Sequence, residues 1–314
     1  MARTPALDRW SLILAGGDGT RLQELTRLIT GKPIPKQYCK LVGGRSLLEA
    51  TLDRTRHFAP RERTLVVFNR DHVDLARDQL CLLPAENQLA QLGNRDTGPG
   101  LLFSLLHLAR RSQSATVAVF PSDHYVSDDR AFVAHVEQAA RIVTRLPNKI
   151  VLLGIRPDYC EPGYGYIETA EPLPDGADFA GAFHVAAFHE KPGPDTVTHL
   201  LRRGGLWNSF VMVFRLERML GLLQRMVASD FERMKAIHAR SRISAAAYRQ
   251  LAAWNFSHRI LARVPEHLVV LRVEDIAWSD WGTPEAIERT FATLKQTPPW
   301  RAAPQLAHPL TAAA

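Results

Sequence analysis

The stretch 14–22, with the sequence LAGGDGTRL, holds residue types that could bind a phosphate group. Three glycines in four positions let the backbone turn sharply and bring bare amide N–H groups close to an anion. Apolar residues then recur at helical spacing, so we expect the loop to open onto the positive end of a helix, where Arg21 stands. A guanidinium there suits phosphate oxygens. The stretch predicts a phosphate-binding loop, although a glycine turn that only joins two elements has the same composition.

Two aspartates far apart in the sequence could hold a metal ion. Asp123, in the segment VFPSDH, follows a buried apolar run at 115–120, and open α/β sheets bind ligands at the carboxyl ends of their strands. One oxygen of Asp123 could ligate Mg²⁺, an ion that phosphate-handling sites often hold in this way. Asp280, in the segment WSDWGT, is the second candidate. The alternative is that Asp123 only caps the turn after its strand.

Strand and helix signals alternate along the first half of the chain and must position these groups. Apolar β-type runs occur at 10–14, 64–68, 115–120 and 150–155, and helical patterns at 46–58, 71–83, 101–111 and 129–146. Ser46 is the expected N-cap of its helix. The alternation predicts an α/β fold with a doubly wound, mostly parallel Rossmann-like sheet. Later strands are expected at 164–168, 184–190, 209–214 and 268–273, with a helical C-terminal part at 215–262.

The composition limits the class of protein. The 314 residues are 46% hydrophobic and 23% charged, which is ordinary for a globular enzyme with a large core. The net charge of +7 raises nucleic acid as a partner, but scattered arginines favour a solvated basic surface. Three distant cysteines and no membrane-length apolar run predict a cytoplasmic protein without a membrane partner. The Pro- and Ala-rich end, 298–314, is expected to be a loose or externally packed tail.

Two neighbouring motifs together resemble a known signature. The stretch 14–22 is followed by Pro35, Lys36 and Gln37, and the pair L-A-G-G-x-G-T-R-L and P-K-Q resembles that of the sugar-nucleotide pyrophosphorylases. Within these nucleotidyltransferases the chain looks most like the mannose-1-phosphate guanylyltransferases. The resemblance implies that a nucleoside triphosphate is joined to a sugar 1-phosphate and that pyrophosphate is released.

The resemblance also implies roles for the charged residues. Arg21 and Lys36 would be the catalytic cations that contact the triphosphate and its developing charge. Asp123, in a P-x-D-H segment, and Asp280, in a late W-S-D-x-G segment, would together bind Mg²⁺. The nucleophile is already an anion at neutral pH, so no general base is expected.

A second group of residues would bind the sugar phosphate. In the E-K-P segment, Glu190 would meet sugar hydroxyls and Lys191 the sugar phosphate. Gly165 matches the glycine of a Y-G-Y-I segment that lets the sugar approach the backbone, and Asn208 matches a W-N-S-G asparagine that reaches the sugar. Phe210 departs from that last motif, because the family usually has glycine there. The departure puts the fine shape of the sugar pocket in doubt.

The segment 94–100, NRDTGPG, resembles the R-N-T-A-P-A segment of the guanylyltransferases and would bind the base. It departs from that motif at Asp96, Gly98 and Gly100, so a plain glycine-rich helix start is an alternative. The segment 255–258, NFSH, lacks the acidic residue of the family's S-F-D. The expected nucleotide-binding residues are Leu14, Ala15, Gly16, Gly17, Gly19, Thr20, Asn94, Thr97 and Gly98.

These observations combine into one expected function. The chain would join GTP and mannose 1-phosphate to give GDP-mannose and pyrophosphate, by Mg²⁺-assisted in-line attack of the sugar phosphate on the α-phosphate. Residues 1–297 would form a single nucleotidyltransferase domain, with a nucleotide-binding half to about residue 160 and a sugar-phosphate-binding half after it. The oligomeric state stays open, and a homo-oligomer is compatible with the sequence. The alternatives are another pair of nucleotide and hexose 1-phosphate, or a non-catalytic regulatory relative that binds a sugar nucleotide.

Overall fold

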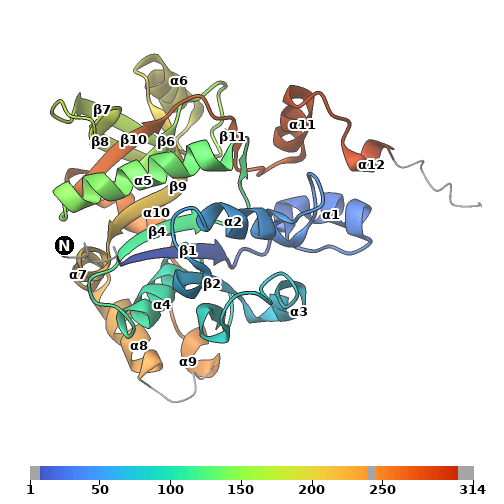
Figure 1. Ribbon diagram of the computed structural model, residues 1–314, viewed down its shortest axis with the longest axis horizontal. Coiled ribbons are helices and arrows are strands. Elements are labelled where there is room, and N and C mark those ends of the chain that lie inside the picture. Colours follow the sequence, from blue (N-terminus) through green and yellow to red (C-terminus); the bar gives the residue numbers. More distant parts are fainter. Residues whose placement is uncertain (1–7, 240–244, 303–314) are drawn as a thin grey trace, which may run out of the picture.

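A nine-stranded sheet runs through the centre of the part of the chain that the computed structural model describes, residues 8–239 and 245–302 (Figure 1). Its strand order is β3-β2-β1-β4-β9-β6-β10-β8-β7, and a second, two-stranded sheet pairs β11 with β5. The strands are β1 (Arg9–Ala15), β2 (Thr64–Asn69), β3 (Gln88–Gln91), β4 (Thr116–Pro121), β5 (Tyr125–Val126), β6 (Ile150–Ile155), β7 (Gly165–Pro172), β8 (Ala182–Glu190), β9 (Leu206–Arg215), β10 (Leu268–Val273) and β11 (Trp278–Ser279).

Helices connect these strands and cover the sheet. The α-helices of the described residues are α1 (Gln23–Thr30), α2 (Leu47–Thr55), α3 (Val73–Ala76), α4 (Thr97–Ala109), α5 (Asp129–Arg145), α6 (Pro194–Arg202), α7 (Leu216–Met226), α8 (Ala228–His238), α9 (Ala245–Arg249), α10 (Phe256–Arg259), α11 (Pro284–Thr293) and α12 (Pro299–Ala302). Short 3₁₀ turns precede several of them, among them η1 (Thr20–Leu22) and η2 (Lys36–Tyr38).

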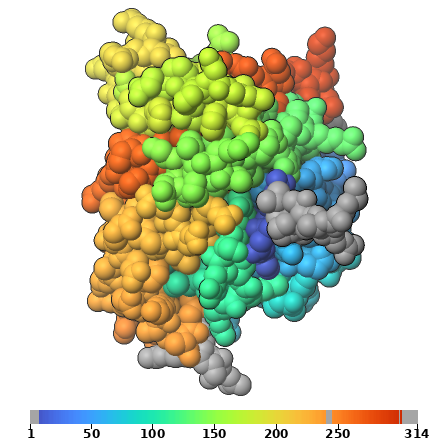
Figure 2. All heavy atoms as spheres, turned by 60° about the vertical axis from the view of Figure 1, so that its left-hand side comes forward, coloured from blue at the N-terminus to red at the C-terminus, as the bar shows by residue number. Residues whose placement is uncertain are grey.

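Both faces of the sheet are buried under helices. Along β1, Leu12 belongs to one apolar core and Ile13 to the other, as the two-residue period of a strand requires. Helices α4, α7 and α8 contribute to the first core, and α2, α5 and α6 to the second. Figure 2 shows α7 and α8, in gold, beside the teal α4. Two covered faces explain the unbroken apolar runs of the central strands, and the expected α/β layering is confirmed.

The expectation of a mostly parallel sheet is wrong for the second half of the chain. The pairings among β1, β2, β3 and β4 are parallel, and so is that of β6 with β10. Strand β9, however, lies antiparallel between β4 and β6, and β7 pairs antiparallel with β8. The connection 173–181 between β7 and β8 is shorter than a parallel crossover needs, so these two strands can only pair as a hairpin.

Most other expected elements are present with shifted ends. The predicted strands at 10–14, 64–68, 150–155 and 268–273 are confirmed, and the helical part at 215–262 is confirmed where it is described. The helix expected at 46–58 ends earlier, and that expected at 71–83 contains only the single turn of α3. The short strands β3, β5 and β11 escaped prediction because two to four residues are too few to show a period. Within residues 8–239 and 245–302, no helix is long and apolar enough to cross a membrane.

The tail expected at 298–314 begins as a short helix. Trp300, on α12, packs edge-on against Phe291 of α11, with ring centroids 5.4 Å apart. This first part of the tail therefore packs against the outside of the molecule, as Figure 1 also shows. The rest of the tail, 303–314, lies outside the described residues.

Replacement of Ser46 by alanine is expected to destabilise the protein by about 1 kcal/mol. Ser46 caps α2: its Oγ accepts from the N–H of Glu49 at 3.1 Å, and Glu49 Oε2 accepts from the N–H of Ser46 at 2.7 Å. The free energy of unfolding in urea measures the effect. The exposed Thr196, inside α6, provides the control, since its replacement by alanine should cost nothing. Equal stabilities of the two variants would contradict the capping role.

Candidate active site

The glycine loop is fixed by the segment that follows α1. Gly19 has a positive φ of 62°, and a methyl group there would lie 2.9 Å from Cα of Pro35. Gln37 Nε2 donates to the carbonyl of Ala15 at 3.2 Å and to that of Gly17 at 2.7 Å. Only glycine at position 19 permits both the backbone conformation and the close approach. The two motifs that first suggested the family therefore form one structural unit.

Lys36 joins two parts of the chain that are 244 residues apart in sequence. Its buried ammonium Nζ lies 3.2 Å from Oδ2 of Asp123. It also donates to the backbone carbonyls of Asp280 and, at 3.0 Å, of Trp281. Asp123 follows β4 and Asp280 follows β11, so the structure brings the Asp123 carboxylate and the backbone of Asp280 to one cation.

The carboxylate of Asp280 is oriented by two donors. Its Oδ1 accepts from the hydroxyl of Tyr164 at 2.8 Å and from the N–H of Gly282 at 2.7 Å. A methyl group at Gly282 would lie 2.7 Å from Oδ2 of Asp280 and 3.1 Å from Nη1 of Arg21. Arg21 is exposed and lies in η1, which leads into α1. The structure therefore places Arg21 beside Asp280.

The charge on Asp123 is maintained by its neighbours. Desolvation acts to raise the pKa of the Asp123 carboxyl, but the Lys36 ammonium beside it is the main opposing cause, and that pKa lies below its ordinary value. Burial is also the main cause that lowers the pKa of His124, so its ring is neutral at pH 7. Asp123 is therefore an anion at neutral pH, as a ligand for a cation must be.

The donor set fits a magnesium ion that is shared with a substrate. Lys36 shows that a cation can be held between the segments of Asp123 and Asp280, and Oδ2 of Asp280 is left outside its two hydrogen bonds. Among the described residues, no three His, Cys, Asp or Glu side chains gather as a complete metal site. Two carboxylates suffice for Mg²⁺, which is usually bound by one or two carboxylates together with substrate phosphates.

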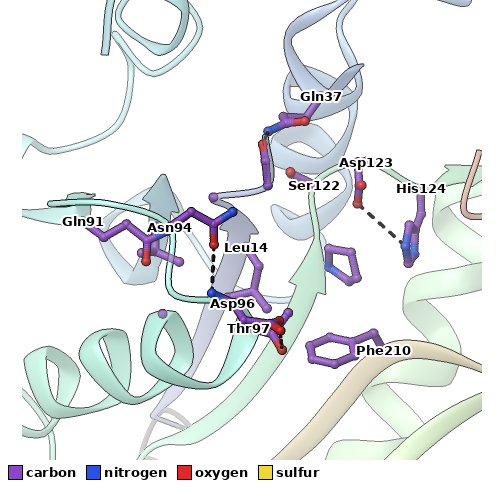
Figure 3. Close-up of a pocket in the computed structure, with 15 residues that line it drawn as sticks. Leu14, Gln37, Gln91, Asn94, Asp96, Thr97, Ser122, Asp123, His124 and Phe210 are labelled. Carbon is purple, nitrogen blue, oxygen red and sulfur yellow. Dashed lines mark hydrogen bonds and ion pairs between the residues drawn. The ribbon is translucent and has the colours of Figure 1, made fainter. Parts of the chain in front are cut away.

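A cavity of 540 Å³ lies between the glycine loop, the segment after β4 and the start of α4. Figure 3 shows Asp123 and His124 at one side of it, with Asn94, Asp96 and Thr97 opposite. The volume is that of a typical small-molecule site. The predicted residues that line the cavity are Leu14, Gly16, Gly17, Asn94, Thr97 and Asp123.

The start of α4 faces this cavity. Asn94 donates to Oδ2 of Asp18 in the glycine loop at 2.8 Å, and its own Oδ1 accepts from the N–H of Asp96 at 2.9 Å. Asp96 has a positive φ of 67° and caps the helix by accepting from the N–H of Thr97. Gly98 does not line the cavity. A methyl group at this position would meet the ring of Trp254 at 2.1 Å. The glycine at 98 is therefore explained by packing against that indole.

The predicted sugar-binding residues form a separate cluster at the edge of the sheet. A methyl group at Gly165 would lie 3.1 Å from Oε2 of Glu190 and 3.5 Å from Cβ of Asn208. These three residues lie on the paired strands β7, β8 and β9, which explains why they meet. Lys191, directly after β8, is exposed and has a positive φ of 49°. The structure thus brings Gly165, Glu190 and Asn208 together and leaves the Lys191 side chain in solvent.

The surroundings of Glu190 favour the neutral form of its carboxyl group. Burial is the main cause that raises the pKa of Glu190, and the nearby Asp96 adds to it. Lys191 and His258 act in the opposite direction, as does a hydrogen bond from Ser257. Ser257 stands at the position where the S-F-D segment of the resembling family has an acidic residue. A second carboxylate at that position would raise the pKa of Glu190 further.

Replacement of Glu190 by glutamine is expected to raise the melting temperature at pH 7. The raised pKa means that the folded protein favours the neutral form of Glu190, so stability falls as the pH rises through that pKa. Glutamine imitates the neutral form, and the difference from the wild type should therefore vanish below pH 4.5. Thermal unfolding across this range tests the sign. The exposed Glu171, changed to glutamine, serves as the control. A lower melting temperature for the Glu190 variant at pH 7 would refute the assignment.

Among the residues of the cavity wall that sequence reasoning missed are two glutamines. Gln91, on β3, lies between two glycines: a methyl group at Gly16 would meet its Nε2 at 2.4 Å, and one at Gly100 its Oε1 at 3.1 Å. Its Oε1 also accepts from the buried hydroxyl of Tyr248 at 3.2 Å. Gln37 is the second, although it was quoted in the P-K-Q motif. The unusual glycines at 16 and 100 were the available signal, because each leaves room for one amide side chain.

A family model described as "Nucleotidyl transferase" matches residues 10–297 of the chain. The chain therefore belongs to the nucleotidyl transferase family. The matched range includes the glycine loop, both aspartates and the sugar cluster. Sequence and site thus agree on the class of protein.

Within that family the chain is similar to mannose-1-phosphate guanylyltransferases. "Mannose-1-phosphate guanylyltransferase 2" of Escherichia coli O157:H7 is 29% identical over 87% of this chain and 58% of that protein. The "Xanthan biosynthesis protein XanB" of Xanthomonas campestris pv. campestris (strain B100) is 36% identical over 68% of this chain and 44% of that protein. The chain spans about half the length of the curated relatives it matches.

A solved structure supports the same similarity to mannose-1-phosphate enzymes of this family. The crystal structure described as "mannose-1-phosphate geranyltransferase" from Thermus thermophilus has a TM-score of 0.77 and 29% sequence identity, and the match covers 91% of this chain and 80% of that one. A structure from Helicobacter pylori, described as a mannose-6-phosphate isomerase, has a TM-score of 0.69 at 19% identity over 87% of this chain and all of that one. The second likeness shows the fold alone.

Proposed function

We propose that this nucleotidyltransferase joins GTP and mannose 1-phosphate to form GDP-mannose and pyrophosphate. One observation carries the proposal: Lys36 contacts both the Asp123 carboxylate and the backbone of Asp280, beside a cavity of nucleotide size that Asp123 lines. The similarity to mannose-1-phosphate guanylyltransferases supports the choice of substrates. We further propose that residues 1–297 act as one domain, with nucleotide and sugar halves that meet at this point, in the cytoplasm.

Different residues would bind the two negatively charged substrates, the nucleoside triphosphate and the sugar 1-phosphate. The backbone of the glycine loop would hold the triphosphate, and the start of α4 would bind the base. Arg21 and Lys36 would neutralise the charge that develops on the leaving pyrophosphate. Glu190 and Asn208 would hold the sugar, and the exposed Lys191 would turn from solvent to its phosphate. The sugar phosphate then attacks in line without a general base, because it is already an anion.

Magnesium would be held by Asp123 and Asp280. When bound, it supplies positive charge that draws the sugar phosphate and the α-phosphate together. Lys36 occupies the same neighbourhood and would keep the two carboxylates close in the absence of substrate.

The experiment is pyrophosphate release with Mg²⁺ across a grid of nucleoside triphosphates and hexose 1-phosphates. We expect release with GTP and mannose 1-phosphate well above any other pair. Release with another pair would retain the reaction and overturn the proposed substrates. No release with any pair, from folded protein, would favour a regulatory relative that binds a sugar nucleotide without catalysis.

A further inference from the structure

Phe210 has a backbone conformation that a bulky residue rarely adopts. Its φ of 58° lies in the left-handed region, where the Cβ of an L-residue crowds the backbone. Non-glycine residues in such conformations persist only where the surrounding structure fixes them, and they concentrate at functional sites. The strain at Phe210 therefore calls for both a structural cause and a function.

The structural cause is an irregularity of β9 that neighbouring side chains hold in place. The register between β6 and β9 shifts at this point, between the pairs of Leu152 and Gly154. Asn208 Oδ1 accepts from the N–H of Phe210 at 3.1 Å. Ser209 Oγ donates to the carbonyl of Leu153 at 2.7 Å and accepts from the N–H of Val211 at 3.2 Å. These bonds fix the turn whatever side chain stands at position 210.

The turn directs the ring of Phe210 to the nucleotide cavity. Phe210 is half-buried and lines that cavity, and Figure 3 shows its ring pointing toward Asp96 and Thr97. The ring packs edge-on against the buried Phe256, with centroids 6.1 Å apart. Phe256 is tied to the base-binding side, because its N–H donates to Thr97 Oγ1 at 2.9 Å. The Phe210 ring is therefore supported by a residue that is itself hydrogen-bonded to the start of α4.

Phe210 also borders the sugar cluster. It lies two residues after Asn208, and its ring packs against Phe256, whose neighbour Ser257 hydrogen-bonds Glu190. The ring thus lines the cavity of the glycine loop and also lies near the cluster on β7, β8 and β9, through its contact with Phe256.

We propose that Phe210 determines the sugar specificity of the site. Its ring packs against the C–H face of the hexose and closes the space that a bulky substituent would need, so that 2-acetamido-hexose 1-phosphates are excluded. This inference rests on the proposed transfer of a nucleotide to a hexose 1-phosphate. An aromatic ring suits the role because one face of a hexose is apolar, and a rigid wall discriminates by size.

The test is Phe210→Gly, which accepts the positive φ and removes the ring. We expect the ratio of kcat/KM for N-acetylglucosamine 1-phosphate to that for the best unsubstituted hexose 1-phosphate to rise by about tenfold or more. The KM for the nucleoside triphosphate should change by less than about threefold. Lys295→Gly is the matched control, because Lys295 is exposed, remote and also has a positive φ, of 53°. That variant should keep the wild-type ratio.

The outcomes separate the two proposals. A wild type that is active on a hexose 1-phosphate, together with an unchanged ratio in Phe210→Gly, overturns the role of Phe210 and leaves the proposed function intact. A wild type that releases no pyrophosphate with any pair overturns both. If Phe210→Gly does not fold, Phe210→Asn decides instead, since asparagine tolerates the left-handed region and is smaller than the ring.

Discussion

Replacement of Lys36 by methionine is expected to lower turnover by about 10²- to 10³-fold while the affinity for nucleoside triphosphate changes by less than tenfold. The ammonium is buried, and Asp123 together with the carbonyls of Asp280 and Trp281 fixes its position. A cation held in advance at the reacting phosphates costs no reorganisation when charge develops on them. Its contribution should therefore appear in the transition state rather than in the ground-state complex.

Single-turnover rates and equilibrium nucleotide binding separate these two contributions. Methionine keeps the length and apolar stem of lysine, which limits the change in packing. The exposed Lys40, four residues away, gives the control Lys40→Met, which should leave both quantities unchanged. Equal losses in turnover and in nucleotide affinity for the Lys36 variant would show that the ammonium only binds the nucleotide. The melting temperature of that variant should fall, because Asp123 is left without its partner.

The layers of the fold could be predicted from the sequence, whereas the reversed directions of β8 and β9 could not. The runs at 64–68, 115–120 and 150–155 are unbroken apolar segments, and burial on both faces leaves that pattern in the sequence. The antiparallel insertion of β9 between β4 and β6 leaves no such pattern. It is set by long-range pairing after α6, and a strand buried on both faces has the same composition in either direction.

Residues of the candidate site could be predicted from the sequence only where they belong to a recognisable motif. Asp123 and Asp280 were both singled out, yet nothing local in the sequence indicated that Lys36 would hold their segments together. The packing contacts of individual residues could be predicted from the sequence even less well. The sequence predicts a nucleotide contact for Gly98, whereas the structure places its backbone against Trp254, more than 150 residues later. Such contacts depend on tertiary geometry and leave only an unexplained glycine in the sequence.

The two aspartates provide the second large expected effect. Asp123→Asn and Asp280→Asn should each lower turnover by at least about 100-fold, and the double variant should lose little more than either single one. If both carboxylates hold one ion, removal of either already abolishes its correct placement. Asparagine is a mild replacement at position 280, because an amide oxygen can still accept from Tyr164 and Gly282.

Calorimetric titration of the nucleotide, with and without Mg²⁺, adds a readout that does not depend on turnover. In the wild type, Mg²⁺ should tighten binding, and each variant should lose most of that gain, since one carboxylate charge is missing from the ion's ligands. The exposed Asp78, changed to asparagine, is the control for loss of a surface charge. Losses of turnover that multiply in the double variant would mean that the aspartates act independently, and the shared metal would have to be abandoned. Losses that do not multiply, together with a lost response to Mg²⁺, would leave one shared ion as the simplest account, because Asp123 precedes β5, Asp280 follows its partner strand β11, and both residues contact Lys36.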